Sequence, residues 1–330
     1  MTFIKKLILF FITATVITLS LAAASSCKPD DFEEMPGIAN IKVYAPDGAP
    51  ALSIANMLAE NKKLGGEEVD YEIVDAQTIQ TFVTGNSPKA DICILPVNLA
   101  VKLLGDGETY KLLGTVTHGN LFLLSNGKTS ITPDNIAELT GKTVGVLNLA
   151  QIPGLTLKLI LKNADLLDKV TLVPVTAPEV GVRDGIDYFV VPEPAASTKV
   201  NALKNLQFSG SLQELYGGEA GYPQAVAVAH KWLADNEIVK DFTNALKASG
   251  EWLLNESTSA EEIVSAVQAH LSDGLSPTFS AKNLSKQVIG NCSVNFVPAT
   301  GCKQDIIEFI AKLNGVSDTS FGTPSNDFFA

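Results

Sequence analysis

Short apolar runs alternate with amphipathic segments from residue 40 to residue 104. The runs are β-type, and the segments between them repeat with the 3.6-residue period of a helix. The run Ala90–Val97 is almost continuously apolar, which is typical of a strand buried on both faces of a parallel sheet. The pattern predicts successive strand–helix units and right-handed crossovers, with strands at 41–44, 69–74 and 90–97 and helices at 51–60, 75–84 and 99–104.

The same rhythm recurs beyond His118-Gly119, where we expect the chain to leave a first lobe. Strands are predicted at 142–147, 170–175, 186–191 and 206–215, and helices at 155–163, 178–184 and 194–203. The run 225–229 predicts a return to the first lobe, and 236–255, 259–271 and 302–313 predict helices. The predicted organisation is a first lobe at 40–120, a second lobe at 121–222, a return with C-terminal helices at 223–314, and a loose tail at 315–330.

The N-terminus predicts export. Lys5 and Lys6 precede an uncharged apolar run from Leu7 to Ala24, and small residues then lead to Cys27. This order resembles a bacterial lipoprotein signal, which implies a signal peptide at 1–26, a lipidated Cys27 and a flexible tether at 27–39. The alternative is an uncleaved membrane anchor, since the run is just long enough to span. Either way the remaining chain is expected outside the cytoplasm, attached to the cell membrane.

Charge narrows the classes of partner. The predicted signal holds two of the 24 basic residues and none of the 36 acidic ones, so the exported part carries 22 basic against 36 acidic residues, a net charge of −14. This excess of acid argues against a nucleic-acid partner and against electrostatic membrane binding. Arg183 is the only arginine, so a strongly anionic ligand would have to rely on helix N-termini.

The cysteines and histidines predict neither a metal site nor a catalytic centre. His118, His230 and His270 are scattered, and no recognised catalytic or phosphate-binding motif is present. We expect Cys93 to be a buried free thiol. Cys292 and Cys302 lie ten residues apart in an exported segment, and we predict a disulfide between them. No cofactor is expected.

Four segments, in order, resemble the solute-binding proteins of ABC importers. They are a Gly/Pro loop with its helix at 46–58, a helix–Gly-Lys–strand at 136–146, the turn, strand and Pro-Glu-Pro at 185–194, and Asn-Phe-Val-Pro-Ala at 295–299. The resemblance covers most of 40–314 and is to the branch that binds thiamine precursors, sulfonates, taurine and nitrate. It implies an α/β, two-lobe periplasmic-binding-protein type 2 fold, in which each lobe is a mainly parallel sheet flanked by helices and the ligand cleft lies between the lobes.

Loops at the carboxyl ends of the strands are where such a fold binds its ligand. Their composition suits this role, because small residues let the backbone approach and a few polar side chains orient a solute. Several have other possible roles: Asn98 and Glu193 could cap helices, and Tyr222 could pack at a hinge. The candidate ligand-binding residues are Asp47, Gly48, Asn98, Thr117, His118, Asn148, Gln151, Thr176, Glu193 and Tyr222.

We therefore predict a monomeric, lipid-anchored, non-catalytic protein that captures a small molecule and delivers it to the membrane subunits of an ABC permease. The acid- and amide-bearing loops favour a neutral or cationic solute. Two alternatives remain: a receptor that senses its ligand without transport, and an enzyme on the same fold, such as a relative of pyrimidine-precursor synthases.

Overall fold

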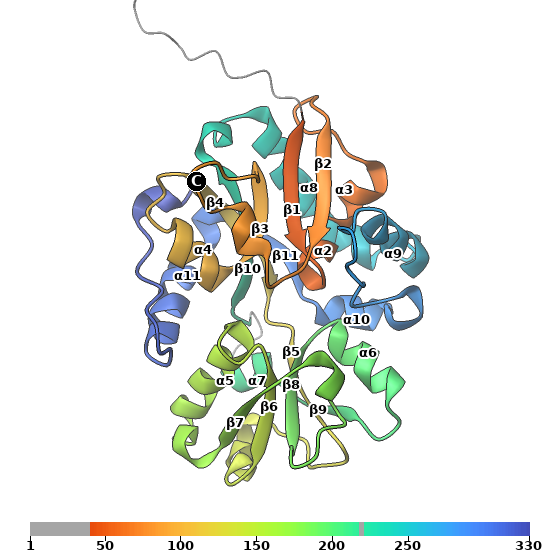
Figure 1. The fold of residues 1–330 in the computed structure, drawn as a ribbon, viewed down its shortest axis with the longest axis vertical. Helices are drawn as coiled ribbons and strands as arrows, with labels where there is room; N and C mark the ends of the chain where they lie inside the picture. Colours follow the sequence, from red (N-terminus) through yellow and green to blue (C-terminus); the bar gives the residue numbers. More distant parts are fainter. Residues whose placement is uncertain (1–39, 218–220) are drawn as a thin grey trace, which may run out of the picture. The chain divides into compact units, whose positions relative to one another are not determined.

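The computed structural model describes residues 40–217 and 221–330, so the predicted signal, the tether and Cys27 lie outside the described residues. Two β-sheets, each flanked by helices, make up this part of the chain (Figure 1). No helix within the described ranges is both long enough and apolar enough to cross a membrane.

The first sheet has six strands in the order β11-β4-β10-β3-β1-β2. Parallel pairs join β1 to β2 and β3, whereas β10 is antiparallel to β3 and β4, and β11 is antiparallel to β4. The sheet is thus parallel where strands and helices alternate, and antiparallel where the returning chain is added. Its strands are β1 (Ile41–Pro46), β2 (Val69–Val74), β3 (Ile92–Pro96), β4 (Tyr110–His118), β10 (Pro223–His230) and β11 (Val294–Pro298).

Helices cover the first sheet, and their apolar stripes explain where they pack. In α8, the buried residues Val239, Phe242, Leu246 and Leu253 follow the helical period. Helix α11 packs on β4 and β10, and α8 packs on β11. The helices of this region are α2 (Ala49–Leu52), α3 (Ala55–Glu60), α4 (Val97–Leu104), α8 (Glu237–Leu254), α9 (Ala260–Gln268), α10 (Lys286–Asn291) and α11 (Ala299–Asn314).

The second sheet has five strands in the order β7-β6-β8-β5-β9. Strand β6 pairs in parallel with β7 and β8, and β5 is antiparallel to both β8 and β9. The strands are β5 (Leu121–Ser125), β6 (Thr143–Leu147), β7 (Thr171–Val175), β8 (Tyr188–Pro192) and β9 (Gln207–Ser211), with helices α5 (Ile152–Asn163), α6 (Ala195–Ala202) and α7 (Leu212–Tyr216). Two sheets flanked by helices confirm the predicted α/β, two-lobe fold class. Each sheet is mixed, however, and not mainly parallel as predicted, because β5, β9, β10 and β11 pair antiparallel.

Local differences from the prediction have physical causes. The helices predicted at 75–84 and 178–184 are single 3₁₀ turns, at Ile79–Phe82 and Ala177–Glu179. The strand predicted at 206–215 ends at Ser211, and α7 follows. The sequence Leu-Gln-Glu-Leu-Tyr before Gly217 contains the signal for this helix, because these residues favour helices and Gly217 adopts the left-handed C-cap conformation (φ 97°).

The prediction of a loose tail at residues 315–330 is wrong. Phe321 and Phe328 are buried, at 6% and 0% exposure. The Ser325 N–H donates to Gly105 O at 2.7 Å, and the Ala330 N–H donates to Leu112 O at 3.0 Å. The polar and glycine-rich composition of residues 315–330 hid these apolar anchors, which hold the C-terminus against α4 and β4.

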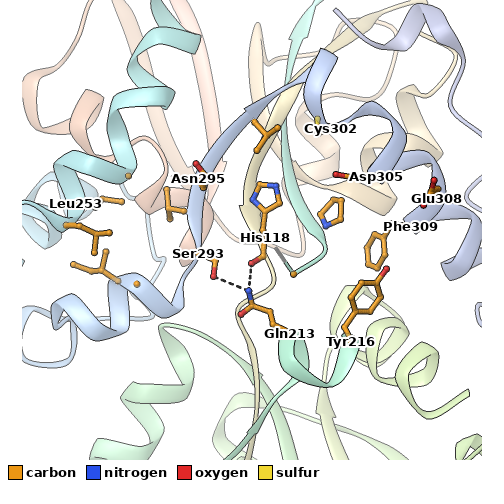
Figure 2. Close-up of a pocket in the computed structure, with 18 of the residues that line it drawn as sticks. His118, Gln213, Tyr216, Leu253, Ser293, Asn295, Cys302, Asp305, Glu308 and Phe309 are labelled. Carbon is orange, nitrogen blue, oxygen red and sulfur yellow. Dashed lines mark hydrogen bonds between the residues drawn. The ribbon is translucent and has the colours of Figure 1, made fainter. Parts of the chain in front are cut away.

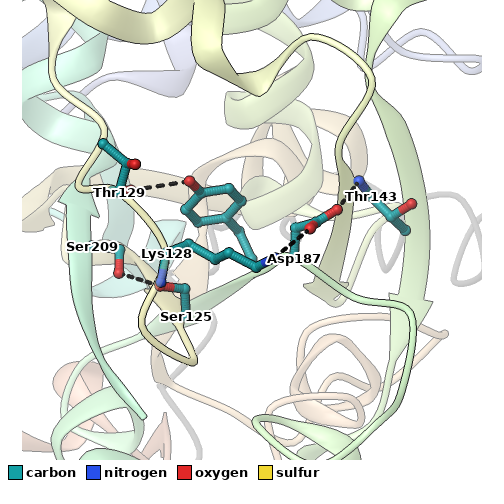
Figure 3. Close-up of polar contacts among 7 residues, drawn as sticks. Ser125, Lys128, Thr129, Thr143, Asp187 and Ser209 are labelled. Carbon is teal, nitrogen blue, oxygen red and sulfur yellow. Dashed lines mark hydrogen bonds and ion pairs between the residues drawn. The ribbon is translucent and has the colours of Figure 1, made fainter. Parts of the chain in front are cut away.

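A polar cluster fastens β5, β6, β8 and β9 together (Figure 3). The Asp187 carboxylate accepts a hydrogen bond from the Thr143 N–H at 3.0 Å and pairs with the Lys128 ammonium at 3.3 Å. The Tyr188 hydroxyl donates to Thr129 O at 2.9 Å. Burial alone would raise the pKa of Asp187, but the Thr143 N–H and the Lys128 ammonium outweigh it and lower this pKa below its ordinary value.

We predict that Asp187→Asn destabilises the fold by about 1 kcal/mol at pH 7, because a charge-assisted contact becomes neutral. Since the folded-state pKa is lowered, this stabilisation exists above the unfolded-state pKa and is lost as pH falls through the folded-state value. Urea unfolding of the variant and the parent should therefore converge at acidic pH. Asp184→Asn, an exposed neighbour, is the control, and a gap that persists at low pH would contradict the explanation.

Candidate ligand site

The chain crosses between its sheets at two adjacent segments. It leaves the first sheet after His118 and enters the second at Leu121, and it re-enters the first sheet at Pro223. The two crossings are hydrogen-bonded to each other, since the Gly119 N–H donates to Tyr222 O at 2.9 Å. Paired connections of this kind form a natural hinge between the two halves.

Gln213, on α7, braces the first crossing. Its Nε2 donates to His118 O at 2.9 Å, and its Oε1 accepts from the Asn120 N–H at 3.4 Å. Gly119 and Gly221 make room for this side chain. A Cβ at Gly119 would overlap the Gln213 side chain, and one at Gly221 would lie 2.9 Å from Gln213 Nε2. Both glycines also have positive φ angles, of 77° and 67°. The sequence prediction missed Gln213 because α7 was assigned to a strand.

The N-termini of two helices, one beside each sheet, meet at Asn98 and Gln151. Asn98 lies in the first turn of α4, directly after β3, and Gln151 is the N-cap residue of α5. The Asn98 Nδ2 donates to Gln151 Oε1 at 3.1 Å. Asn98 is completely buried, and its Oδ1 has no hydrogen-bond partner among the described residues. A buried amide oxygen in this state favours a further N–H or O–H donor.

Neither of these helices has a side-chain cap. By contrast, α8, α9 and α10 are capped by Asn236, Ser259 and Ser285. The first-turn N–H groups of α4 and α5 therefore have no side-chain acceptor at the place where the two helices meet. Together with the positive ends of the helix dipoles, they make this junction favourable for a carbonyl or an anionic group.

The other lobe-one loop is stabilised by Asp47. Its carboxylate accepts from the Gly48 N–H and from the Thr278 N–H, both at 2.7 Å. Burial raises the pKa of Asp47, and the two N–H donors act in the opposite direction. Gly48, with φ of 99°, permits the turn into α2. Asn148 is exposed in a left-handed conformation (φ 63°) in the turn before Gln151.

Glu193 caps α6, as one of its two sequence interpretations proposed. Its carboxylate accepts from the Ser197 N–H at 2.9 Å and from the Ser197 hydroxyl at 2.7 Å, and the residue is 1% exposed. Thr176 similarly caps a 3₁₀ turn through Glu179, and the Thr117 hydroxyl accepts from the Ala225 N–H at 3.2 Å. These contacts give Glu193, Thr176 and Thr117 structural roles.

Tyr222 is buried at the second crossing. Its ring stacks on Phe309 at 5.5 Å and meets Tyr216 edge-on at 5.4 Å. With 1% of its surface exposed, Tyr222 packs at the hinge, which is the alternative that the sequence left open.

His118 lines a cavity of about 490 Å³ beside the crossings (Figure 2). Of the ten candidate residues, it alone does so. The rest of the lining, including Gln213, Tyr216 and Phe309, comes mainly from α7, α8, α10, β11 and α11. The His118 Nε2 lies 2.8 Å from the Thr115 hydroxyl. Burial lowers the pKa of the imidazole, against the opposing effect of the Asp305 carboxylate.

The predicted Cys292–Cys302 disulfide is wrong, because both thiols are free and buried. Strand β11, which extends over roughly 13 Å at about 3.3 Å per residue, lies between the two cysteines in the chain. A disulfide requires Cα atoms within about 7 Å. Cys93 is also free and buried, as predicted, and burial raises the pKa of all three thiols.

No protein-family model matches the chain, and no curated protein matches its sequence. Solved structures do match. An ABC transporter structure from Parabacteroides distasonis has a TM-score of 0.71 at 19% identity, over 88% of this chain and 99% of that one. The periplasmic aliphatic sulphonate-binding protein of Escherichia coli has a TM-score of 0.60 at 11% identity, over 88% and 92%.

A ligand-binding component of an ABC-type import system from Staphylococcus aureus has a TM-score of 0.59 at 14% identity, over 88% of this chain and 96% of that one. At these identities the similarity shows the fold. The chain therefore has the two-lobe fold of ABC-transporter solute-binding proteins, in agreement with the resemblance found in its sequence.

We predict that Asn98 and Gln151 are energetically coupled. A neutral hydrogen bond of this kind contributes about 0.5–1.5 kcal/mol, so Asn98→Ala, Gln151→Ala and the double variant should give non-additive free energies of unfolding. Urea titration of the four proteins measures this coupling. The control cycle combines Asn98→Ala with Gln77→Ala at an exposed position, and its free energies of unfolding should be additive. Additivity in both cycles would show that the contact contributes nothing.

Proposed function

We propose that this protein is an extracytoplasmic solute-binding protein that captures one small molecule between its two halves and delivers it to an ABC import permease. The observation that carries the proposal is the meeting of two uncapped helix N-termini from different sheets at Asn98 and Gln151. The fold supports it, because structures with this fold include binding components of ABC transporters.

The junction favours a solute with two kinds of polar group. An anionic or carbonyl oxygen suits the first-turn N–H groups of α4 and α5, and an N–H or O–H donor suits the Asn98 Oδ1. This revises the sequence-based preference for a neutral or cationic solute, which rested on loop composition. The sulphonate bound by the E. coli protein is one example of such an anionic group.

The proposed role is binding without turnover. The thiols of Cys93, Cys292 and Cys302 are buried, and burial raises their pKa values, so they stay protonated and are poor nucleophiles. The described residues also contain no cluster of three or more His, Cys, Asp or Glu side chains able to hold a metal ion. Binding without turnover requires neither a thiol nucleophile nor a metal ion.

We predict saturable 1:1 binding of a small solute and no chemical change in it. Calorimetry should test sulfonates, nitrate, amino acids and pyrimidines against the exported chain. Asn98→Ala should weaken the affinity by about tenfold or more, because it removes a buried polar contact. The matched control, Gln77→Ala, should leave the affinity unchanged. Failure of every solute to bind would contradict the proposal.

We further propose that the protein is a monomer anchored through lipid on Cys27. Cys27→Ser should then move the protein from the membrane fraction to the soluble fraction, because the lipid that holds the mature chain in the membrane is attached through the Cys27 thiol and serine cannot carry it. Fractionation followed by immunoblotting measures this, with Cys93→Ser as the control. Retention of the Cys27→Ser variant as an unprocessed membrane protein would favour the uncleaved anchor.

A further inference from the structure

The cavity beside the crossings is bounded by elements associated with both sheets. Helices α8, α10 and α11 and strand β11 contribute one part of its wall, and Gln213 and Tyr216 on α7 contribute the other (Figure 2). Its volume of about 490 Å³ lies in the range of small-molecule sites. The candidate solute residues Asn98 and Gln151 are not among those that line it.

Part of the wall is apolar. Two aromatic rings, Tyr216 and Phe309, lie 6.0 Å apart at 85° and form one side. Aliphatic side chains complete it, and Leu254 among them is 50% exposed. These lining residues are Leu253, Leu254, Ile289, Val294 and Val297.

Two carboxylates give the cavity its charge. Asp305 and Glu308 are three residues apart on α11 and therefore lie on one face of that helix. Both are exposed, and neither belongs to an ion pair formed within residues 40–217 and 221–330. The C-terminal end of α8 also lines the cavity, but the Lys286 ammonium donates to Leu253 O at 2.8 Å and to Asn255 O at 2.7 Å, so this helix end adds no free negative charge.

Two basic side chains, Lys312 and His118, line the same space. The Lys312 ammonium lies 5.6 Å from the centroid of the Tyr216 ring and 3.4 Å from its hydroxyl, so this wall already attracts one cation. His118 is held largely neutral by burial and does not offset the carboxylates. With one ammonium and two carboxylates, the lining has a net charge of about −1 at neutral pH.

We propose that this cavity is a second small-molecule site, which takes an organic ammonium compound with an aromatic or apolar body. The ammonium group pairs with Asp305 and Glu308, and the apolar body packs against Tyr216, Phe309 and the aliphatic wall. Such a ligand contacts α7 and α11 together. The site is separate from the solute site proposed at Asn98 and Gln151, and it does not depend on that proposal.

The test uses 2-phenylethylamine as the probe and the full exported chain. Calorimetry should show saturable 1:1 binding, with 2-phenylethanol about tenfold weaker or more and phenylacetate weaker still, because the alcohol lacks the charge and the acid reverses it. Equal binding of the three compounds, or the absence of saturable amine binding, would overturn the proposal.

Variants locate the binding. Asp305→Asn with Glu308→Gln should weaken amine binding by about tenfold or more, and both positions are exposed, so the fold should tolerate them. The matched control, Asp134→Asn with Glu261→Gln, should have no effect. Asn295→Trp, at an exposed lining position, should block the cavity and abolish binding.

Asn98→Ala separates this proposal from the proposed solute function, since it should weaken solute binding and leave amine binding unchanged. Amine binding that survives both the double carboxamide variant and Asn295→Trp would place the amine elsewhere and refute the second site.

Discussion

The pairing of the two crossing segments is the constraint on which the arrangement of this protein depends. The Gly119–Tyr222 backbone bond holds the crossings side by side, and Gln213 ties the first crossing to α7 through His118 O and the Asn120 N–H. Both glycines that flank Gln213 are needed because a Cβ at either position would meet its side chain. The two halves also meet where Asn98, after β3, donates to Gln151, after β6.

The pattern of apolar residues along the chain predicted the strands of both sheets, because a strand buried on both faces is a nearly continuous apolar run. Ala90–Val97 and Ile186–Val191 correspond to β3 and β8, and the loops after such strands supplied Asn98 and Gln151. Short-range signals were weaker. Two predicted helices are 3₁₀ turns, and α7 was read as strand. Gln213 was missed for that reason, although Gly217 after Leu-Gln-Glu-Leu-Tyr marks a helix end.

Contacts in the structure decided between alternatives that the sequence pattern left open. Glu193 could contact a ligand or cap a helix, and its contacts with Ser197 show the cap. Phe328 gives no periodic signal, yet it is buried against a distant part of the chain. The cysteine spacing suggested a disulfide, but β11 extends between Cys292 and Cys302. Of these outcomes, the burial of Phe328 depends on long-range packing, which a single sequence does not specify.

We infer that the two halves move about the paired crossings and that, on closure, Asn98 of one half contacts Gln151 of the other. The most direct measurement is the distance between spin labels at Lys102→Cys on α4 and Asn163→Cys on α5, taken with and without a solute found by calorimetry. Both positions are exposed, and the native thiols of the described residues are buried. Without solute we expect a broad distribution of label-to-label distances, and with solute we expect only the short distances to remain. A single distance unaffected by bound solute would contradict this inference.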